Sequence, residues 1–207
     1  MTLVKVCGIT RVEDAVTAVR LGAGAIGLNF VPSSPRRIDE ATGHAIARAV
    51  REAAGTSVLL VGVVADMTYE DMRALASRAA LDLLQLHGSE TPDVLDRVLP
   101  GAYKAMGIER EEDVARAGTF RGEHLLADAK VEGVLGGTGK TFDWRLVREL
   151  AKVRKLMLAG GLTPENVARA VREVGPWAVD VASGVELAPG VKDASKMRAF
   201  IDAARSA

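Results

Sequence analysis

The chain has 207 residues, a hydrophobic fraction of 48%, and 27 basic against 27 acidic residues, so its formal net charge is zero. This length suits a single domain spanning residues 1–207, and the hydrophobic content is too high for a disordered chain. The balanced charge offers no excess of positive charge for nucleic acid or an anionic membrane surface. Cys7 is the only cysteine, which excludes an intramolecular disulfide and a cysteine-cluster metal site.

The apolar runs are short. The longest, 21–28 and 58–65, have eight residues each when glycine is counted as apolar, well below the roughly 20 needed to span a bilayer. The N-terminus begins a strand-like run at once and lacks a signal-peptide pattern. We therefore expect a soluble, cytoplasmic protein.

Strand-like runs alternate with amphipathic stretches along the whole chain. Most are rich in Val, Leu, Ile or Ala without strict alternation, which is typical of strands buried on both faces of a parallel sheet. The predicted strands are 3–6, 25–30, 58–65, 82–86, 102–106, 124–127, 155–159 and 178–181.

Helical spacing of apolar residues marks the intervening segments, for example 12–19, 72–79 and 197–204. A capping-box pattern at Thr10–Glu13 and the pair Thr163-Pro164 predict helix starts. The helix around 107–116 has the weakest pattern. Eight strand–helix units predict an α/β fold, a single-domain (β/α)8 TIM barrel, with an open doubly wound sheet as the alternative.

Polar residues and glycines follow the predicted strands, where barrel enzymes carry their active sites. Gly160-Gly161 and Ser183-Gly184 follow the seventh and eighth strands, the usual place of a barrel phosphate site. Glycine lets backbone N–H groups approach an anion closely. Tight turns are the alternative, but the pairing at both expected places favours phosphate.

The segment 136–141 contains Gly139-Lys140-Thr141, which invites comparison with a nucleotide-binding P-loop. That motif requires glycine at position 134, which is Val134, so the spacing fails. Length and glycine content favour a mobile loop that covers the site, with a passive surface loop as the alternative.

Cys7 and Asp128 are the candidate acid–base residues. Cys7 ends the first strand, which favours a functional thiol over an inert buried one. Asp128 follows a short apolar run, where partial desolvation would suit a general acid, although a turn cap explains it equally well.

Arg36 and Arg37 each carry a planar guanidinium, and we expect one of them to bind a carboxylate through two hydrogen bonds. The alternative is that both are solvated surface charges. His87 taken alone favours a structural role. No second ligand stands near it, so we predict no metal.

Together these residues resemble those of the phosphoribosylanthranilate isomerase family. The resemblance extends in family order over nearly the whole chain. Its matching parts are KVCGIT at Lys5–Thr10, Ser34–Arg37, Gln85–Gly88, Asp128, Gly136–Trp144, Ala159–Asn166 and Asp180–Glu186.

The resemblance implies a (β/α)8 barrel and an Amadori rearrangement of N-(5-phosphoribosyl)anthranilate in tryptophan biosynthesis. It assigns Cys7 as general base and Asp128 as general acid. It places Arg36 on the anthranilate carboxylate, and Gly160, Gly161, Ser183 and Gly184 on the phosphate. We predict that His87 also contacts substrate.

We expect no cofactor, one small phosphosugar substrate, no nucleic-acid or membrane partner, and a monomer or homodimer. The rival hypotheses are a metal-dependent phosphosugar epimerase, an aldolase using Lys104 or Lys130, and a non-catalytic sugar-phosphate sensor on the same fold.

Overall fold

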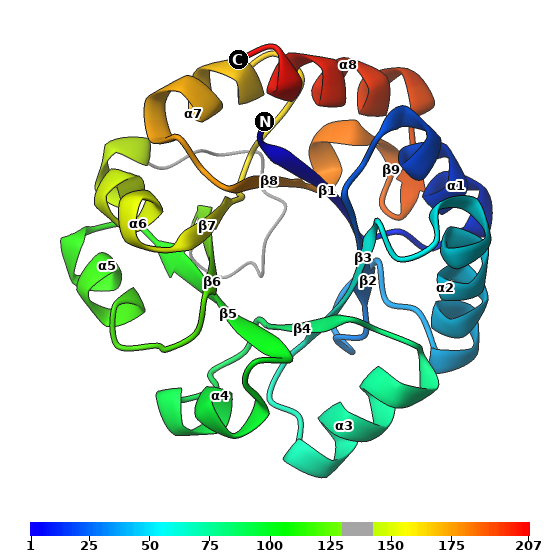
Figure 1. The fold of residues 1–207 in the computed structure, drawn as a ribbon, viewed down its shortest axis with the longest axis horizontal. Coiled ribbons are helices and arrows are strands. Elements are labelled where there is room, and N and C mark those ends of the chain that lie inside the picture. Colours follow the sequence, from blue (N-terminus) through cyan, green and yellow to red (C-terminus); the bar gives the residue numbers. More distant parts are fainter. Residues whose placement is uncertain (130–142) are drawn as a thin grey trace.

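A computed structural model of the chain describes residues 1–129 and 143–207. Its eight parallel strands form a closed barrel in sequence order, with each strand beside its chain neighbours and β1 beside β8 (Figure 1). The predicted (β/α)8 barrel is confirmed, and the open-sheet alternative is wrong. The strands of the barrel are β1 (Leu3–Cys7), β2 (Ala25–Asn29), β3 (Leu59–Val64), β4 (Leu83–Leu86), β5 (Ala102–Ile108), β6 (His124–Ala129), β7 (Lys155–Leu158) and β8 (Ala178–Val181).

Helices cover the outside of the barrel (Figure 1). After β8, a short 3-10 turn η2 (Ser183–Val185) leads into a small hairpin of β9 (Glu186–Ala188) and β10 (Val191–Lys192). The helices are α1 (Val12–Leu21), α2 (Glu40–Ala54), α3 (Tyr69–Arg78), α4 (Pro92–Val98), α5 (Glu111–Ala117), α6 (Arg148–Val153) preceded by the 3-10 turn η1 (Trp144–Val147), α7 (Val167–Val174) and α8 (Ala194–Arg205).

The predicted strands agree with the structure to within two residues at every end, but three helix starts were predicted wrongly. The helix expected from Gly107 begins at Glu111, because β5 continues to Ile108 in register with β6. Thr10 caps no helix, because its hydroxyl donates to Gly190 O at 2.6 Å. Helix α7 begins at Val167 rather than at Pro164.

Two apolar clusters hold the barrel together. One lies between the strands and the helices and includes Ile26, Leu60 and Phe200. The other lies in the lumen and contains Ala25, Val61, Tyr103, Ala105, Leu126, Met157, Ala159 and Ala178. Side chains two residues apart on a strand share a face. Because Tyr103 and Leu126 point into the lumen, the residues two positions further along the same strands, Ala105 and Asp128, point inward as well. No helix in the described part of the chain has the length and apolar character needed to cross a membrane.

Candidate active site

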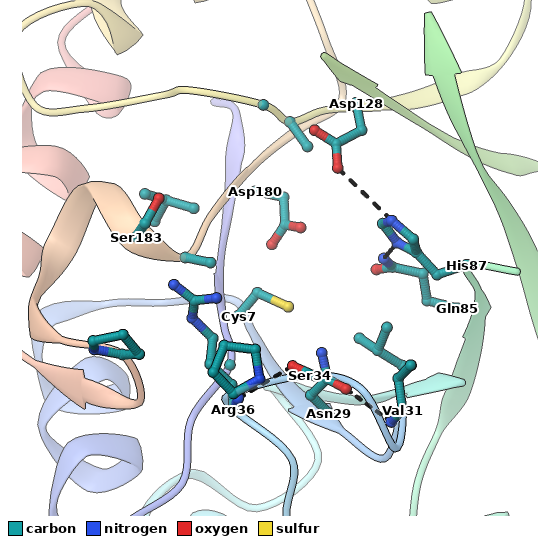
Figure 2. A pocket seen from close by; sticks show the side chains of 18 of the residues that line it. Cys7, Asn29, Val31, Ser34, Arg36, Gln85, His87, Asp128, Asp180 and Ser183 are labelled. Atoms are coloured by element: carbon teal, nitrogen blue, oxygen red, sulfur yellow. Dashed lines mark hydrogen bonds and ion pairs between the residues drawn. The ribbon is translucent and has the colours of Figure 1, made fainter. Parts of the chain in front are cut away.

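A cavity of about 580 Å³ opens at the carboxyl ends of the strands. Its walls come from β1–β4, β6 and β8 and from the loops after β1, β2, β4, β7 and β8, and Figure 2 shows side chains of this lining. The predicted site residues that line it are Cys7, Arg36, His87, Asp128, Gly160, Gly161 and Ser183. Gly184 is not among the residues that line the cavity but directly follows Ser183, and an added Cβ there would overlap the carbonyl oxygen of Leu162. The segment 136–141, expected to form a loop over the site, lies outside the described residues.

Cys7 is the last residue of β1 and is only 8% exposed. Its register partner is Gly27, where a Cβ would lie 2.6 Å from the sulfur, so glycine at this position makes room for the thiol. Burial raises the pKa of the Cys7 thiol, and the nearby Asp180 carboxylate raises it further, while Lys5 opposes both. The thiol is therefore protonated at neutral pH, and its thiolate, once formed, is an unusually strong base.

Asp128 lies inside β6 rather than after it, with Gly107 of β5 as its register partner. Its position is two residues beyond the lumen residue Leu126, so its carboxylate reaches the cavity. Figure 2 shows Asp128 beside His87, across the open space from Cys7 and Arg36. The acid and base candidates thus face the same volume from opposite sides.

His87 directly follows β4, and its ring Nε2 lies 3.9 Å from Asp128 Oδ2. Burial lowers the pKa of His87, and the positive charges of Lys104 and Lys5 lower it further. The ring is therefore neutral at pH 7. Within the described residues, no group of three or more His, Cys, Asp or Glu side chains is arranged to hold a metal ion.

Arg36, not the exposed Arg37, reaches the cavity. Its guanidinium is held by Glu186 through two bonds, from Nε to Oε1 at 2.9 Å and from Nη2 to Oε2 at 2.7 Å. The same carboxylate accepts from Lys192 Nζ at 2.8 Å. Burial works against the charge of Glu186, but these two cations keep the pKa of its carboxyl below the ordinary value.

Two glycine-bearing loops form the remaining wall. Gly160 and Gly161 both have positive φ, at 86° and 63°, which side chains rarely allow. The side chain of Asn166 donates to Gly161 O and accepts from Thr163 N, both at 2.9 Å, which fixes this loop before α7 begins. In residues 1–129 and 143–207, no hydrogen bond uses the N–H groups of Gly160, Gly161, Ser183 or Gly184. These donors are available to an anion.

The sequence analysis missed four polar residues that lie deeper in the barrel. Lys5, Gln85 and Asp180 are almost completely buried, and so is Tyr103. Lys5 pairs in register with Asp180, and Gln85 with Tyr103. The sequence did contain an indication of these residues, because each is a polar residue inside an otherwise apolar strand. Lys5 and Gln85 also stand two positions before Cys7 and His87, and side chains two positions apart on a strand share a face.

Lys104, the lysine of the aldolase hypothesis, is absent from the cavity wall. Its ammonium donates to Leu86 O, Gly88 O and Glu90 Oε2 at 3.2, 2.6 and 2.7 Å. An amine in this position has no path to a substrate carbonyl in the cavity. Lys130, the other lysine of that hypothesis, lies outside the described residues.

The closed barrel and the polar cavity at the carboxyl ends of its strands define a (β/α)8-barrel protein of the enzyme type. A family model described as N-(5'phosphoribosyl)anthranilate (PRA) isomerase matches residues 4–203. The chain belongs to this family.

Individual relatives agree with the family model. The N-(5'-phosphoribosyl)anthranilate isomerase of Pseudomonas aeruginosa (strain LESB58) is 45% identical over 206 residues, which cover 98% of this chain and 95% of the relative. The crystal structure of the Thermotoga maritima phosphoribosyl anthranilate isomerase has a TM-score of 0.90 at 38% identity and covers 100% of both chains. A phosphoribosyl anthranilate isomerase in complex with reduced 1-(o-carboxyphenylamino)-1-deoxyribulose 5-phosphate has a TM-score of 0.86 at 35% identity, again over 100% of both chains.

Proposed function

We propose that the chain catalyses the Amadori rearrangement of N-(5-phosphoribosyl)anthranilate to 1-(2-carboxyphenylamino)-1-deoxyribulose 5-phosphate, a step of tryptophan biosynthesis in the cytoplasm. The observation that carries the proposal is the placement of Cys7 and Asp128 on opposite sides of one cavity, in a chain of this family. One small phosphosugar occupies this cavity, and the reaction involves neither nucleic acid nor a membrane.

Asp128 acts as the general acid in the first step. Its proton goes to the furanose ring oxygen as the bond between that oxygen and C1 breaks. The lone pair of the anthranilate nitrogen forms the C1=N bond and leaves an iminium cation. Acid catalysis of this kind contributes about 10²–10⁴-fold.

Cys7 acts as the general base in the second step. Its thiolate takes the proton from C2, the C–H electrons form the C1=C2 bond, and the nitrogen recovers its electron pair. The enol then becomes the C2 ketone as C1 gains a proton and the C2 hydroxyl loses its own to solvent. The substrate nitrogen serves as the electron sink, so the chemistry requires no metal, nucleotide or flavin.

The two anionic groups of the substrate bind at different places in the cavity wall. Arg36 binds the anthranilate carboxylate through the edge of its guanidinium that Glu186 leaves open. The phosphate binds the N–H groups of Gly160, Gly161, Ser183 and Gly184, at the loops after the seventh and eighth strands. His87 contacts the substrate beside Asp128.

The test is turnover of freshly prepared phosphoribosylanthranilate, followed by the loss of its fluorescence. We expect consumption by the wild type and its loss in Cys7→Ala, with the variant still folded by circular dichroism. A folded wild type that binds the reduced product analogue without consuming substrate would overturn the proposal in favour of the sugar-phosphate sensor.

A further inference from the structure

A chain of buried polar groups crosses the floor of the cavity from the side of Cys7 to that of Asp128. Lys5 Nζ donates to Asp180 Oδ1 at 3.0 Å and to Gln85 Oε1 at 2.9 Å. Burial opposes the charge on Lys5, but the Asp180 carboxylate outweighs it and raises the pKa of the ammonium. Lys5 is therefore a fixed cation at the centre of this chain.

The ammonium of Lys5 determines the orientation of the Gln85 amide. An ammonium has no acceptor capacity, so the atom that faces it must be the amide oxygen. The hydroxyl of Tyr103 also meets this oxygen, at 3.0 Å. Burial raises the pKa of the Tyr103 phenol, so the hydroxyl keeps its proton and donates it to Oε1. The amide nitrogen must then point the other way.

The amide nitrogen of Gln85 lies 3.1 Å from Nδ1 of His87 (Figure 2). Since the amide nitrogen can only donate, Nδ1 must accept and therefore carries no proton. The positive charges of Lys104 and Lys5 lower the pKa of the ring, while the negative charges of Asp180 and Glu90 raise it. Burial and the lysines prevail, so the ring is neutral and its single proton resides on Nε2.

We propose that Gln85 is a positioning residue that holds His87 in the Nε2–H tautomer, so that the ring presents a donor to Asp128 across the 3.9 Å between Nε2 and Oδ2. This inference rests on the proposed role of Asp128 as general acid. A donor at this place stabilises the carboxylate that remains after Asp128 gives up its proton. In the opposite tautomer Nε2 would face Asp128 with a lone pair. This lone pair repels the Asp128 carboxylate, and it competes with the furanose oxygen of the substrate for the proton of Asp128.

The test begins with the tautomer itself. Histidine labelled with ¹⁵N in its ring distinguishes Nδ1–H, Nε2–H and doubly protonated forms by NMR, and the chain has three histidines. The His87 signals are those missing in His87→Gln. In the wild type we expect a protonated Nε2 and an unprotonated Nδ1. A proton on Nδ1 of the wild type would overturn the inference without any activity measurement.

The decisive variant is Gln85→Glu. One carboxylate oxygen can still accept from Lys5 and Tyr103, while the other accepts from His87 and draws a proton to Nδ1. We expect the NMR signature to change accordingly and kcat for phosphoribosylanthranilate to fall by about 10–100-fold, less than the roughly 10²–10⁴-fold of a whole acid–base contribution because Asp128 itself is retained. Gln85→Met supplies no donor to Nδ1, so we expect a mixture of the two His87 tautomers and a smaller fall in kcat. This variant replaces Gln85→Glu in the test if Gln85→Glu does not fold.

Tyr103→Phe is the matched control. It removes one of the two donors to Gln85 Oε1 and leaves Lys5 to orient the amide. We expect the His87 tautomer to be retained and kcat to fall by less than about threefold, the residual effect of one neutral hydrogen bond. A changed tautomer with normal turnover in Gln85→Glu would overturn the positioning role. An inactive wild type with the expected tautomer would instead refute the proposed function and, with it, the catalytic half of this inference.

Discussion

The guanidinium of Arg36 and the carboxylate of Glu186 form a two-bond ion pair at the rim of the cavity, at 2.9 and 2.7 Å. The side chains are 14% and 5% exposed, so water competes weakly with the pair. Glu186 begins β9, and its second cation, Lys192, also donates to the carbonyl oxygens of Cys7 and Ala182 at the ends of β1 and β8. The hairpin after the barrel therefore fixes the arginine proposed to bind the substrate carboxylate.

Glu186→Gln should weaken substrate binding more than it slows the chemistry. The neutral amide loses a charge-assisted bond to Arg36, and such bonds are worth about 1.5–3 kcal/mol. We expect KM to rise by about tenfold or more, with kcat changed by less than about threefold. Steady-state kinetics measure both.

Arg37→Gln is the matched control for this substitution, because Arg37 is exposed and lies outside the cavity wall. Its KM should equal that of the wild type. A fall in kcat at unchanged KM in Glu186→Gln would contradict a ground-state contact between Arg36 and the substrate carboxylate.

Asp128→Asn should abolish most of the turnover while leaving the barrel intact. The amide has nearly the same shape as the carboxyl group but cannot deliver a proton to the ring oxygen. We expect kcat to fall by about 10²–10⁴-fold. Affinity for the reduced product analogue, measured by calorimetry, should stay within about threefold, because the proposed carboxylate and phosphate contacts are untouched. A variant with kcat above one tenth of the wild-type value would rule out Asp128 as the acid.

The reactivity of Cys7 should rise with pH well into the alkaline range. Burial, reinforced by the charge of Asp180, raises the pKa of this thiol above its ordinary value of about 9.0. Because the thiolate is the nucleophile in alkylation, the alkylation rate should increase as pH rises through the raised pKa. The rate of iodoacetamide alkylation reports this thiol alone, since Cys7 is the only cysteine.

The same chain unfolded in urea provides the reference for this measurement. Its thiol should titrate at the ordinary value, below the midpoint of the folded protein, and Cys7→Ala should show no alkylation. A folded midpoint below the unfolded one would show that Lys5 and Lys192 outweigh burial and Asp180.

The barrel could be predicted from the sequence because its strands are continuous apolar runs, such as Leu59–Val64, separated by helical periodicity. Cys7 and Asp128 could be found because they stand at strand ends, and Arg36 because it lies in the loop that follows β2. The pair of Arg36 with Glu186 joins positions 150 residues apart, and local spacing says nothing about it. The hydroxyl of Thr10 matched a capping box, yet a tertiary contact with Gly190 uses it instead.

Lys5 and Gln85 were missed for another reason. Each lies inside a strand that is otherwise apolar, so the sequence pattern indicates a buried strand and not a site. Only the alternation of side chains along the strand places Lys5 on the same face as Cys7 and Gln85 on the same face as His87. The proton arrangement inferred for His87 depends on which atoms of Gln85, Lys5 and Tyr103 meet in the lumen. These contacts join residues from different strands, so the sequence does not predict them and only the three-dimensional structure reveals them.

Lys104→Met should strongly destabilise the fold. Lys104 and Glu90 form a buried ion pair at 2.7 Å, with side chains 3% and 2% exposed. The Glu90 carboxylate also accepts from Asp66 N and Gly88 N, so it joins the loops after β3 and β4. Removing the ammonium leaves this carboxylate buried without its cation, which typically costs about 3–5 kcal/mol. Urea denaturation should show a correspondingly lower free energy of unfolding.

The double variant Lys104→Met/Glu90→Gln separates the unpaired charge from the lost packing. The neutral glutamine can still accept one backbone N–H while carrying no charge that needs a partner. If the unpaired charge causes the destabilisation, the double variant should be more stable than Lys104→Met by at least about 1 kcal/mol, a coupling within the range seen for residues in direct contact. If instead the two substitutions destabilise additively, Lys104 contributes through packing of its methylene chain and not through its charge.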